Sequence, residues 1–211
     1  MQIEKLSDHQ KNSVKLKDQE HKTWRIFARW LSCLFSPPLL ISIIVLIVSA
    51  DTGWNSAWFW SVFLIFVGVL LPIFYLQVQV RRGLLPNLGL YDRQSRIRPL
   101  LLVLSSLLLG WFIMWARSAP LNLIFLTGSG VLTIAIFLLI TLQWKISGHT
   151  TAAAYFAVIL VGLMGNQYMP LFAMPLFVAW SRVFLKRHSL SQTIGGIMLG
   201  SCSALLFLLL Q

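Results

Sequence analysis

Two histidines and a few arginines are the residues of this sequence whose types and spacing suit catalysis. His149 follows a serine and a glycine, and His188 stands six positions after Arg182. After Asp92 the chain contains no Asp or Glu. Both clusters interrupt apolar sequence, and ionisable groups at membrane depth are costly enough that they usually mark a site. The pattern therefore indicates chemistry carried out by histidines and arginines with almost no carboxylate.

Arginines beside a Ser-Gly turn that opens a helix form a binding site for phosphate. Guanidinium groups offer paired N–H donors to phosphate oxygens, and the free amides of a helix N-terminus favour the same anion. Of two histidines near a bound phosphate, one can attack phosphorus while the other protonates the leaving oxygen. The arginines would stabilise charge on the equatorial oxygens. Because carboxylates are scarce, a magnesium or two-metal mechanism is disfavoured, and we expect neither a metal nor a cofactor.

The elements that must position these residues are membrane-spanning helices. The chain has 211 residues, of which 57% are hydrophobic and 11% charged, and its mean hydropathy is +0.78. Such a composition predicts an all-α, polytopic membrane helix bundle, because a backbone in lipid must satisfy its own hydrogen bonds. A spanning helix needs about 20 mostly apolar residues. That rule yields seven candidate spans, at Trp30–Ala50, Trp54–Val80, Leu100–Ala116, Leu121–Trp144, Thr151–Tyr168, Pro170–Leu185 and Thr193–Leu210.

Two of these spans are ambiguous, so the sequence predicts six or seven transmembrane helices. The fifth and sixth are short and separated only by Met169-Pro170, so they could form a single broken helix. The first contains Pro37-Pro38, which would kink that helix or shift its start.

The first 29 residues form a separate block, which divides the chain into a polar, basic tail (1–29) and a transmembrane domain (30–211). The tail holds four of the six acidic residues and seven of the 17 Lys and Arg residues. Its composition suits a partly disordered cytosolic segment. The alternative is a basic segment that lies on anionic lipid.

Orientation follows from the distribution of positive charge. With seven spans, the tail, the 81–99 loop, the 145–149 turn and the 181–188 segment all emerge on one side of the membrane. That side then carries every Lys and Arg except Arg117. The positive-inside rule makes it cytoplasmic. We therefore expect an integral protein of the plasma (inner) membrane whose N-terminus and active-site face are cytoplasmic.

Three short motifs in this order resemble the type-2 phosphatidic acid phosphatase (PAP2) superfamily of membrane lipid phosphatases. That family is known for Lys-x6-Arg-Pro, then Pro-Ser-Gly-His, then Ser-Arg-x5-His-x3-Asp. Here the motifs stand as Arg98-Pro99, Ser147-Gly148-His149 and Ser181-Arg182-x5-His188. The resemblance covers roughly residues 91–200 and implies a PAP2-like helical core.

The resemblance also implies roles for individual residues. His188 would be the nucleophile that forms a phosphohistidine, and His149 would be the acid for the leaving group. Arg98 and Arg182 would bind the phosphate, together with Ser147, Gly148 and Ser181. The residues that could support this site are Asp92, Arg93, Lys145 and Gln192.

Two positions depart from the family pattern. Tyr91 occupies the lysine position of the first motif, where Arg93, Arg96 or Lys145 could supply the missing charge. Gln192 occupies the position of the aspartate that orients the nucleophilic histidine. A glutamine can hold an imidazole by a hydrogen bond, but it cannot stabilise an imidazolium as a carboxylate does. We therefore expect Asp92 either to approach the basic cluster and replace that aspartate, or to pair with one of its arginines.

The function that these observations favour is an integral membrane phosphatase that hydrolyses a lipid phosphate or an isoprenyl diphosphate through a phosphohistidine. Its partners would be the lipid bilayer and an amphiphilic phosphate substrate; no nucleic acid is expected, and the oligomeric state is open. One alternative is a degenerate member that binds a lipid phosphate without hydrolysing it, which Tyr91 and Gln192 favour. A second is a small transporter of anionic lipids, which would predict broken helices at the bilayer midplane and an internal repeat.

Overall fold

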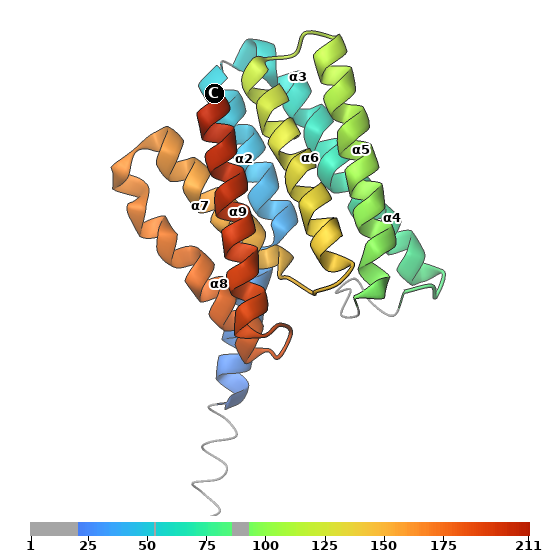
Figure 1. Ribbon diagram of the computed structural model, residues 1–211, viewed down its shortest axis with the longest axis vertical. Coiled ribbons are helices and arrows are strands. Elements are labelled where there is room, and N and C mark those ends of the chain that lie inside the picture. The colour runs from blue at the N-terminus through green and yellow to red at the C-terminus, as the bar shows by residue number, and fades with distance from the viewer. Residues whose placement is uncertain (1–20, 53, 86–92) are drawn as a thin grey trace, which may run out of the picture.

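A computed structural model describes residues 21–52, 54–85 and 93–211, and these residues form helices and connecting turns with no strand among them (Figure 1). The predicted all-α membrane fold is confirmed. Residues 21–34 are helical and precede α2. The elements that follow are α2 (Pro37–Thr52), α3 (Trp54–Ile65), η1 (Phe66–Leu70), α4 (Leu71–Arg81), η2 (Gln94–Arg96), α5 (Ile97–Ala116), α6 (Leu121–Thr141), α7 (Gly148–Met164), η3 (Asn166–Phe172), α8 (Ala173–Phe184) and α9 (Leu190–Leu210).

Within the described residues, five helical stretches are long and apolar enough to cross a membrane. The first includes the break before Pro37, where the chain leaves the helix for two residues and re-enters it with proline in the first turn. Proline is tolerated there because the amide it lacks would have no partner within the helix. The second stretch is α3 and α4 joined by the single π-helical segment η1. The five stretches are His21–Thr52, Ala57–Arg81, Gln94–Ala116, Leu121–Thr141 and Leu190–Leu210.

The fifth and sixth candidate spans form a hairpin rather than one broken helix. Figure 1 shows α7 running away from the lower end of the bundle and α8 running back toward it, with η3 making the turn. The turn begins at Gly165, whose φ of +93° a residue with a side chain rarely adopts. At about 1.5 Å per residue, the 12 residues of α8 extend only about 18 Å. This short return helix brings Arg182 and His188 back to the end of the bundle where α7 begins.

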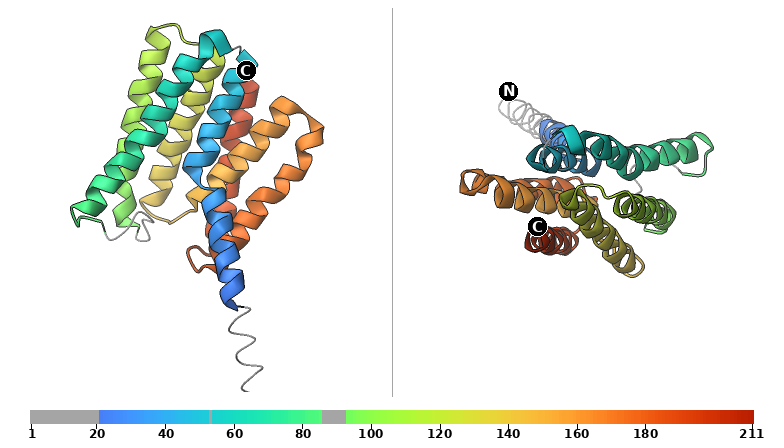
Figure 2. Two further views of the ribbon diagram at one scale, coloured as in Figure 1. Left: turned by 180° about the vertical axis from the view of Figure 1, so that it is seen from behind. Right: turned by 90° about the horizontal axis from the view of Figure 1, so that it is seen from above.

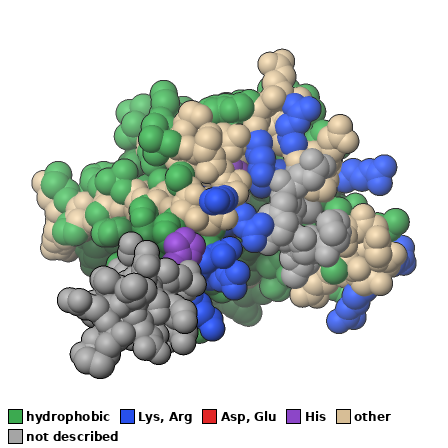
Figure 3. Space-filling model, turned by 90° about the horizontal axis from the view of Figure 1, so that it is seen from below, with side chains coloured by type: hydrophobic (Ala, Val, Ile, Leu, Met, Phe, Trp, Pro, Cys, Tyr) green, Lys and Arg blue, Asp and Glu red, His purple; other side chains and the backbone are tan. Residues whose placement is uncertain are grey.

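The basic segments lie at one end of the molecule. The end of α4, the start of α5, the end of α6, the start of α7, the end of α8 and the start of α9 share the lower end of Figure 1. Seen from that end, the surface gathers Lys and Arg side chains (Figure 3). The alternation of the helices therefore places the three sequence clusters on one face, as expected; that this face is cytoplasmic stays a prediction.

Close contact between α7 and α9 holds this end of the bundle together. A Cβ built on Gly196 would lie 2.3 Å from Thr150 Oγ1, and one on Gly200 would lie 2.1 Å from the Thr151 carbonyl oxygen. Only glycine allows the backbones to approach this closely, which is how small residues promote helix association in lipid. The starts of α7 and α9 are consequently held side by side.

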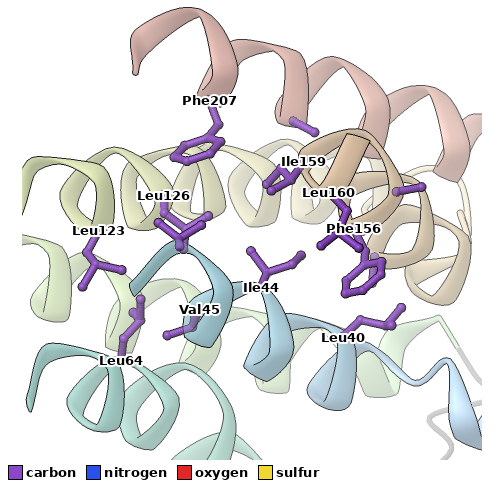
Figure 4. Packing of buried hydrophobic residues seen from close by; sticks show 14 of the residues in the cluster. Leu40, Ile44, Val45, Leu64, Leu123, Leu126, Phe156, Ile159, Leu160 and Phe207 are labelled. Atoms are coloured by element: carbon purple, nitrogen blue, oxygen red, sulfur yellow. The ribbon is translucent and has the colours of Figure 1, made fainter. Parts of the chain in front are cut away.

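The packed interior lies between α2, α6, α7 and α9. Ile44, Leu123, Ile159 and Phe207 come from these four helices, and each is at most 2% exposed (Figure 4). Because lipid tails are as apolar as these side chains, the stabilisation comes mainly from close van der Waals packing rather than from removal of water. The packing fixes α2 against α6 and α7, and all three helices form walls of the cavity described next.

Candidate functional site

A cavity of about 370 Å³ opens among α2, η1, α4, α5, α6 and α7. Its walls are mostly apolar, and its charged and titratable side chains gather near the basic end of the bundle. No Asp or Glu of the described chain lines it. The residues that form the basic end are Arg96, Gly148, His149, Arg182 and His188.

His188 is held by a hydrogen bond to a residue one helical turn later. It lies in the turn between α8 and α9 and is only 7% exposed. Its Nδ1 lies 3.2 Å from Gln192 Oε1, and the backbone N–H of Ser189 donates to the same oxygen at 3.2 Å. An amide N–H can only donate, so the shared atom must be the oxygen, and Nδ1 must donate to it as well. Nδ1 therefore carries the proton, which leaves the lone pair on Nε2.

The start of α9 explains why Gln192 is oriented in this way. Ser189 and Gln192 form a capping box: the Ser189 hydroxyl accepts from the Gln192 backbone N–H at 3.3 Å, while the Gln192 side chain reaches back to Ser189. The pattern Ser-x-x-Gln before an apolar run is a sequence signature of this motif. Sequence reasoning considered Gln192 only as a substitute for aspartate and missed the capping box that places it.

His188 is neutral near pH 7. Burial, followed by the positive charges of Arg96, Arg182 and Lys145, lowers the pKa of His188 from 6.5 to about 3, and the hydrogen bond to Gln192 opposes this only in part. Burial and the neighbouring positive charges each make a positive charge on the imidazole ring unfavourable. The ring is thus unprotonated at Nε2 in the free protein, as a nucleophile must be.

His149 is the second residue of α7 and lines the cavity near His188, close enough for electrostatic interaction with it. Ser147 caps the helix, and its hydroxyl accepts from the Thr150 backbone N–H at 3.4 Å. The Ser147 backbone N–H donates to the Gln192 carbonyl oxygen at 3.1 Å, and the Thr150 hydroxyl donates to the Thr193 carbonyl oxygen at 3.1 Å. These two bonds join the starts of α7 and α9, so the two histidines keep a fixed relation.

Arg182 is buried at 8% exposure near the end of α8 and also lines the cavity. Its Nη1 donates to the Ser32 hydroxyl at 2.7 Å. Ser32 belongs to the helix of residues 21–34 and is itself buried. A single serine in an apolar helix has no motif around it, so sequence reasoning missed this contact.

The structure brings Arg96, rather than Arg98, to the cavity. Arg98 is exposed and does not line the cavity, whereas Arg96 lines it and donates from Nη1 to the Ile146 carbonyl oxygen at 3.3 Å. Residues two apart on a helix point to roughly opposite sides, while residues three apart share a face. Pro99, three positions after Arg96, accordingly lines the cavity too. Arg96, considered from sequence only for the missing lysine charge, is the arginine that lines the cavity just before α5.

Four other expected site residues support the surroundings without lining the cavity. Lys145 Nζ donates to the Arg187 carbonyl oxygen at 3.3 Å, which holds the turn before His188. Arg93 Nη1 donates to the Leu142 carbonyl oxygen at 2.7 Å, at the end of α6. Ser181 is buried, and its hydroxyl donates to the Val178 carbonyl oxygen at 2.8 Å. The fourth is Ser147, the cap of α7.

The hypothesis about Asp92 falls outside the described residues, as does Tyr91. Within the described chain, the only acidic residue is Asp51, near the end of α2 away from the basic face. Residues 21–52, 54–85 and 93–211 also bring no group of three His, Cys, Asp or Glu side chains together. The arrangement can bind an anion and offers it one neutral imidazole nucleophile.

Comparison with known families adds a match to the C-terminal part of the chain. Residues 125–211 match the model of the PAP2 superfamily, which confirms the resemblance seen in the motifs. The matched region contains the second and third motifs, His149 and His188 included, whereas Arg98-Pro99 precedes it. Searches of curated proteins and of solved structures found no significant match.

Proposed function

With its C-terminal region assigned to the PAP2 superfamily, we propose that this chain is an integral membrane phosphatase that cleaves a phosphate from an amphiphile through a phosphohistidine. The observation that carries the proposal is the state of His188: neutral, with Nδ1–H donated to Gln192 and the lone pair on Nε2, in a cavity that it shares with two arginines. A purely structural histidine has no need of this combination.

Phosphate binding comes first in the proposed reaction. Arg96 and Arg182 line the cavity beside both histidines, and the free amides at the start of α7 lie at the same end. Guanidinium forks and helix N-terminal amides are the preferred partners of phosphate oxygens. They would hold the phosphorus near His188 and stabilise the charge that the equatorial oxygens carry in the transition state.

Transfer then proceeds in two displacements. In the first, the His188 Nε2 lone pair forms a bond to phosphorus, and the bond from phosphorus to the leaving oxygen breaks. His149, which takes up a proton together with the anionic substrate, gives that proton to the leaving oxygen. In the second, His149 removes a proton from water, the water oxygen bonds to phosphorus, and the bond to His188 breaks. Inorganic phosphate leaves, and both histidines return to their starting states.

Gln192 is expected to limit the rate of the proposed reaction. It fixes the reactive tautomer of His188, yet its neutral amide cannot compensate the positive charge that the ring gains on phosphorylation. The transferred phosphoryl group, which is itself negative, has to supply that compensation. We therefore expect a competent but slower enzyme than one with a carboxylate at this position.

The proposed substrate is a phosphate monoester or diphosphate of a lipid, with phosphatidate, phosphatidylglycerophosphate and an isoprenyl diphosphate all compatible. The basic end of the bundle would face the cytoplasm by the positive-inside rule. The substrate would then enter laterally from the inner leaflet of the plasma membrane, head group toward the arginines.

Phosphate release by the purified protein in detergent tests the proposal. Wild type, His188→Ala and the control His21→Ala are compared on a panel of lipid phosphates with EDTA present; His21 lies in the N-terminal helix outside the cavity. Release by wild type and by His21→Ala, but not by His188→Ala, supports the proposal. No release from any substrate, or equal release by all three proteins, contradicts it.

A second candidate, binding of a lipid phosphate without hydrolysis, is favoured by Gln192 in place of the family aspartate. It predicts that phosphate-bearing lipid co-purifies with wild type and is lost when the cavity arginine Arg182 is replaced. Retained lipid without phosphate release would establish this function instead.

A further inference from the structure

We propose that the apolar part of the cavity holds one hydrocarbon chain of the substrate and limits its length. Gly130 sets the width of the cavity partway along its depth. This inference rests on the proposed function, because it concerns the tail of the same phosphate amphiphile. It follows from the depth and the lining of the cavity.

The cavity is about as deep as one leaflet of a membrane. Its lining extends along α5 from Arg96 to Leu107 and along α6 from Phe137 to Leu126. Both intervals are eleven residues long, so at about 1.5 Å per residue each measures about 16 Å. The hydrocarbon core of a bilayer is about 30 Å thick. A lipid whose phosphate lies at the arginines would thus extend its hydrocarbon chain through the cavity to about the depth that the chain reaches in a membrane leaflet.

The deep part of the cavity offers nothing to a polar ligand. Aliphatic side chains of α2, α3 and α6 line it, among them Ile44, Leu64 and Leu126. The hydroxyls that reach it already have partners: Thr127 donates to the Leu123 carbonyl oxygen at 2.7 Å, and Tyr155 shares a 2.6 Å hydrogen bond with Ser129. Apolar cavities of this kind stay dry and take apolar ligands. The lining is therefore matched to a hydrocarbon chain.

We infer that a lipid chain enters the cavity between α2 and α4, which both contribute to its wall. Pro37 and Ile41 of α2 and Leu76 of α4 line the cavity from its two sides near the basic end. Figure 2 shows α2 and the α3–α4 stretch diverging toward that end, with α6 visible behind them. A lipid would then pass its chain sideways between these two helices while its head group stays at the basic face.

Gly130 lies on the cavity wall about midway along its depth. It is seven residues from Phe137, or about 10 Å along α6. A Cβ built on Gly130 meets no other atom within 4 Å, whereas one on Gly68, across the cavity in η1, would lie 3.1 Å from Leu107 Cδ2. A larger side chain at position 130 can therefore extend into the space without displacing a neighbour. It would shorten the part of the cavity open to a chain.

A series of straight-chain alkyl phosphates tests this inference. We expect wild-type kcat/KM to rise with chain length up to a plateau, because each buried methylene adds to binding. In Gly130→Leu the plateau should come at shorter chains, with the ratio of long-chain to short-chain kcat/KM reduced about tenfold or more, equivalent to two or more methylenes no longer buried. Gly130→Ala should give a smaller reduction, and it keeps the test valid if the leucine variant fails to fold.

The control is Leu132→Phe, which adds bulk on the same helix at an exposed position outside the cavity. If its chain-length profile matches that of Gly130→Leu, or if wild type shows no dependence on chain length, the inference is overturned while the phosphatase function stands. If wild type hydrolyses neither the alkyl phosphates nor any member of the lipid-phosphate panel, the proposed function fails instead. Equilibrium binding of labelled long and short alkyl phosphates to wild type and both variants then decides the cavity inference separately.

Discussion

The Nδ1 of His188 lies 3.2 Å from Oε1 of Gln192, four residues later at the start of α9. The same oxygen accepts the backbone N–H of Ser189, so a helix cap and the tautomer of the histidine depend on one side-chain amide. Because the cap fixes the amide oxygen, the histidine keeps its proton on Nδ1. Local helix formation thereby leaves the lone pair on Nε2, the atom that we propose as the nucleophile.

Replacing Gln192 tests that relation. In Gln192→Ala the imidazole loses its orienting acceptor, and we expect kcat to fall about 10²-fold or more, as when a catalytic histidine loses its correct tautomer. Gln192→Glu keeps an acceptor and adds a negative charge, so it should retain far more activity than the alanine variant. The control is Gln167→Ala, at the opposite end of the bundle. Equal kcat values for the alanine and glutamate variants would argue against an orienting role.

The pH dependence of kcat/KM gives a second prediction. The pKa of His188 is lowered to about 3 by burial and by the neighbouring positive charges, so its neutral, nucleophilic form persists well below pH 6.5. After correction for the ionisation of the substrate, the acid limb of wild type should lie below that value. In Gln192→Glu the added carboxylate favours the imidazolium, so the limb should move to higher pH. A wild-type limb at or above pH 6.5 would contradict the assignment.

The lowered pKa of His188 also has a consequence for stability. An unfolded chain, with the histidine pKa near 6.5, binds more protons than the folded protein between about pH 3 and pH 6.5. The contribution of His188 to the free energy of unfolding is therefore fully present above pH 6.5 and declines as the pH falls. Melting temperatures in detergent should show a smaller loss on acidification in His188→Ala than in wild type.

Arg96 and Arg98 should behave differently. Arg96→Ala removes a cavity guanidinium, and we expect kcat/KM to fall about 10²- to 10³-fold, as when one donor that stabilises transition-state charge is removed. Arg98→Ala, at an exposed position, should stay within about twofold of wild type because surface changes have small effects. Phosphate release by the two purified variants checks this directly. The opposite order would mean that Arg98 binds the phosphate.

Ser32 should affect kcat/KM only through its hydrogen bond to Arg182. Ser32→Ala removes the 2.7 Å partner of Nη1, and a hydrogen bond to a charged group contributes about 1.5–3 kcal/mol, so kcat/KM should fall about tenfold or more. Ser32→Thr retains the hydroxyl and should restore most of the activity. Ser42→Ala, whose hydroxyl donates to the Pro38 carbonyl oxygen in α2, is the matched control. No difference between Ser32→Ala and Ser42→Ala would remove the positioning role.

Several parts of the site were predictable because they depend on sequence order alone. Long apolar runs predict spanning helices, and the alternation of those helices decides which loops share a side of the membrane. The motifs around His149 and Arg182 could therefore be expected to meet, and both residues do line one cavity. Their types also support the proposed chemistry, since phosphate binding needs cationic donors and transfer needs a nucleophile and an acid.

Only the tertiary structure decided which side chains reach the cavity. The choice of Arg96 over Arg98 depends on how η2 passes into α5, because a shift of two residues there turns a side chain to the opposite face of the helix. The contact between Ser32 and Arg182 joins residues 150 positions apart, and no local pattern specifies such a pair. The shape of the apolar cavity depends on how the helices that line it, α2 and α4 among them, are arranged in space. The sequence by itself determined the class and the shared face, because these follow from composition and order. The folded bundle decided the partners of the site residues and the shape of the cavity, because these depend on helix phase and packing.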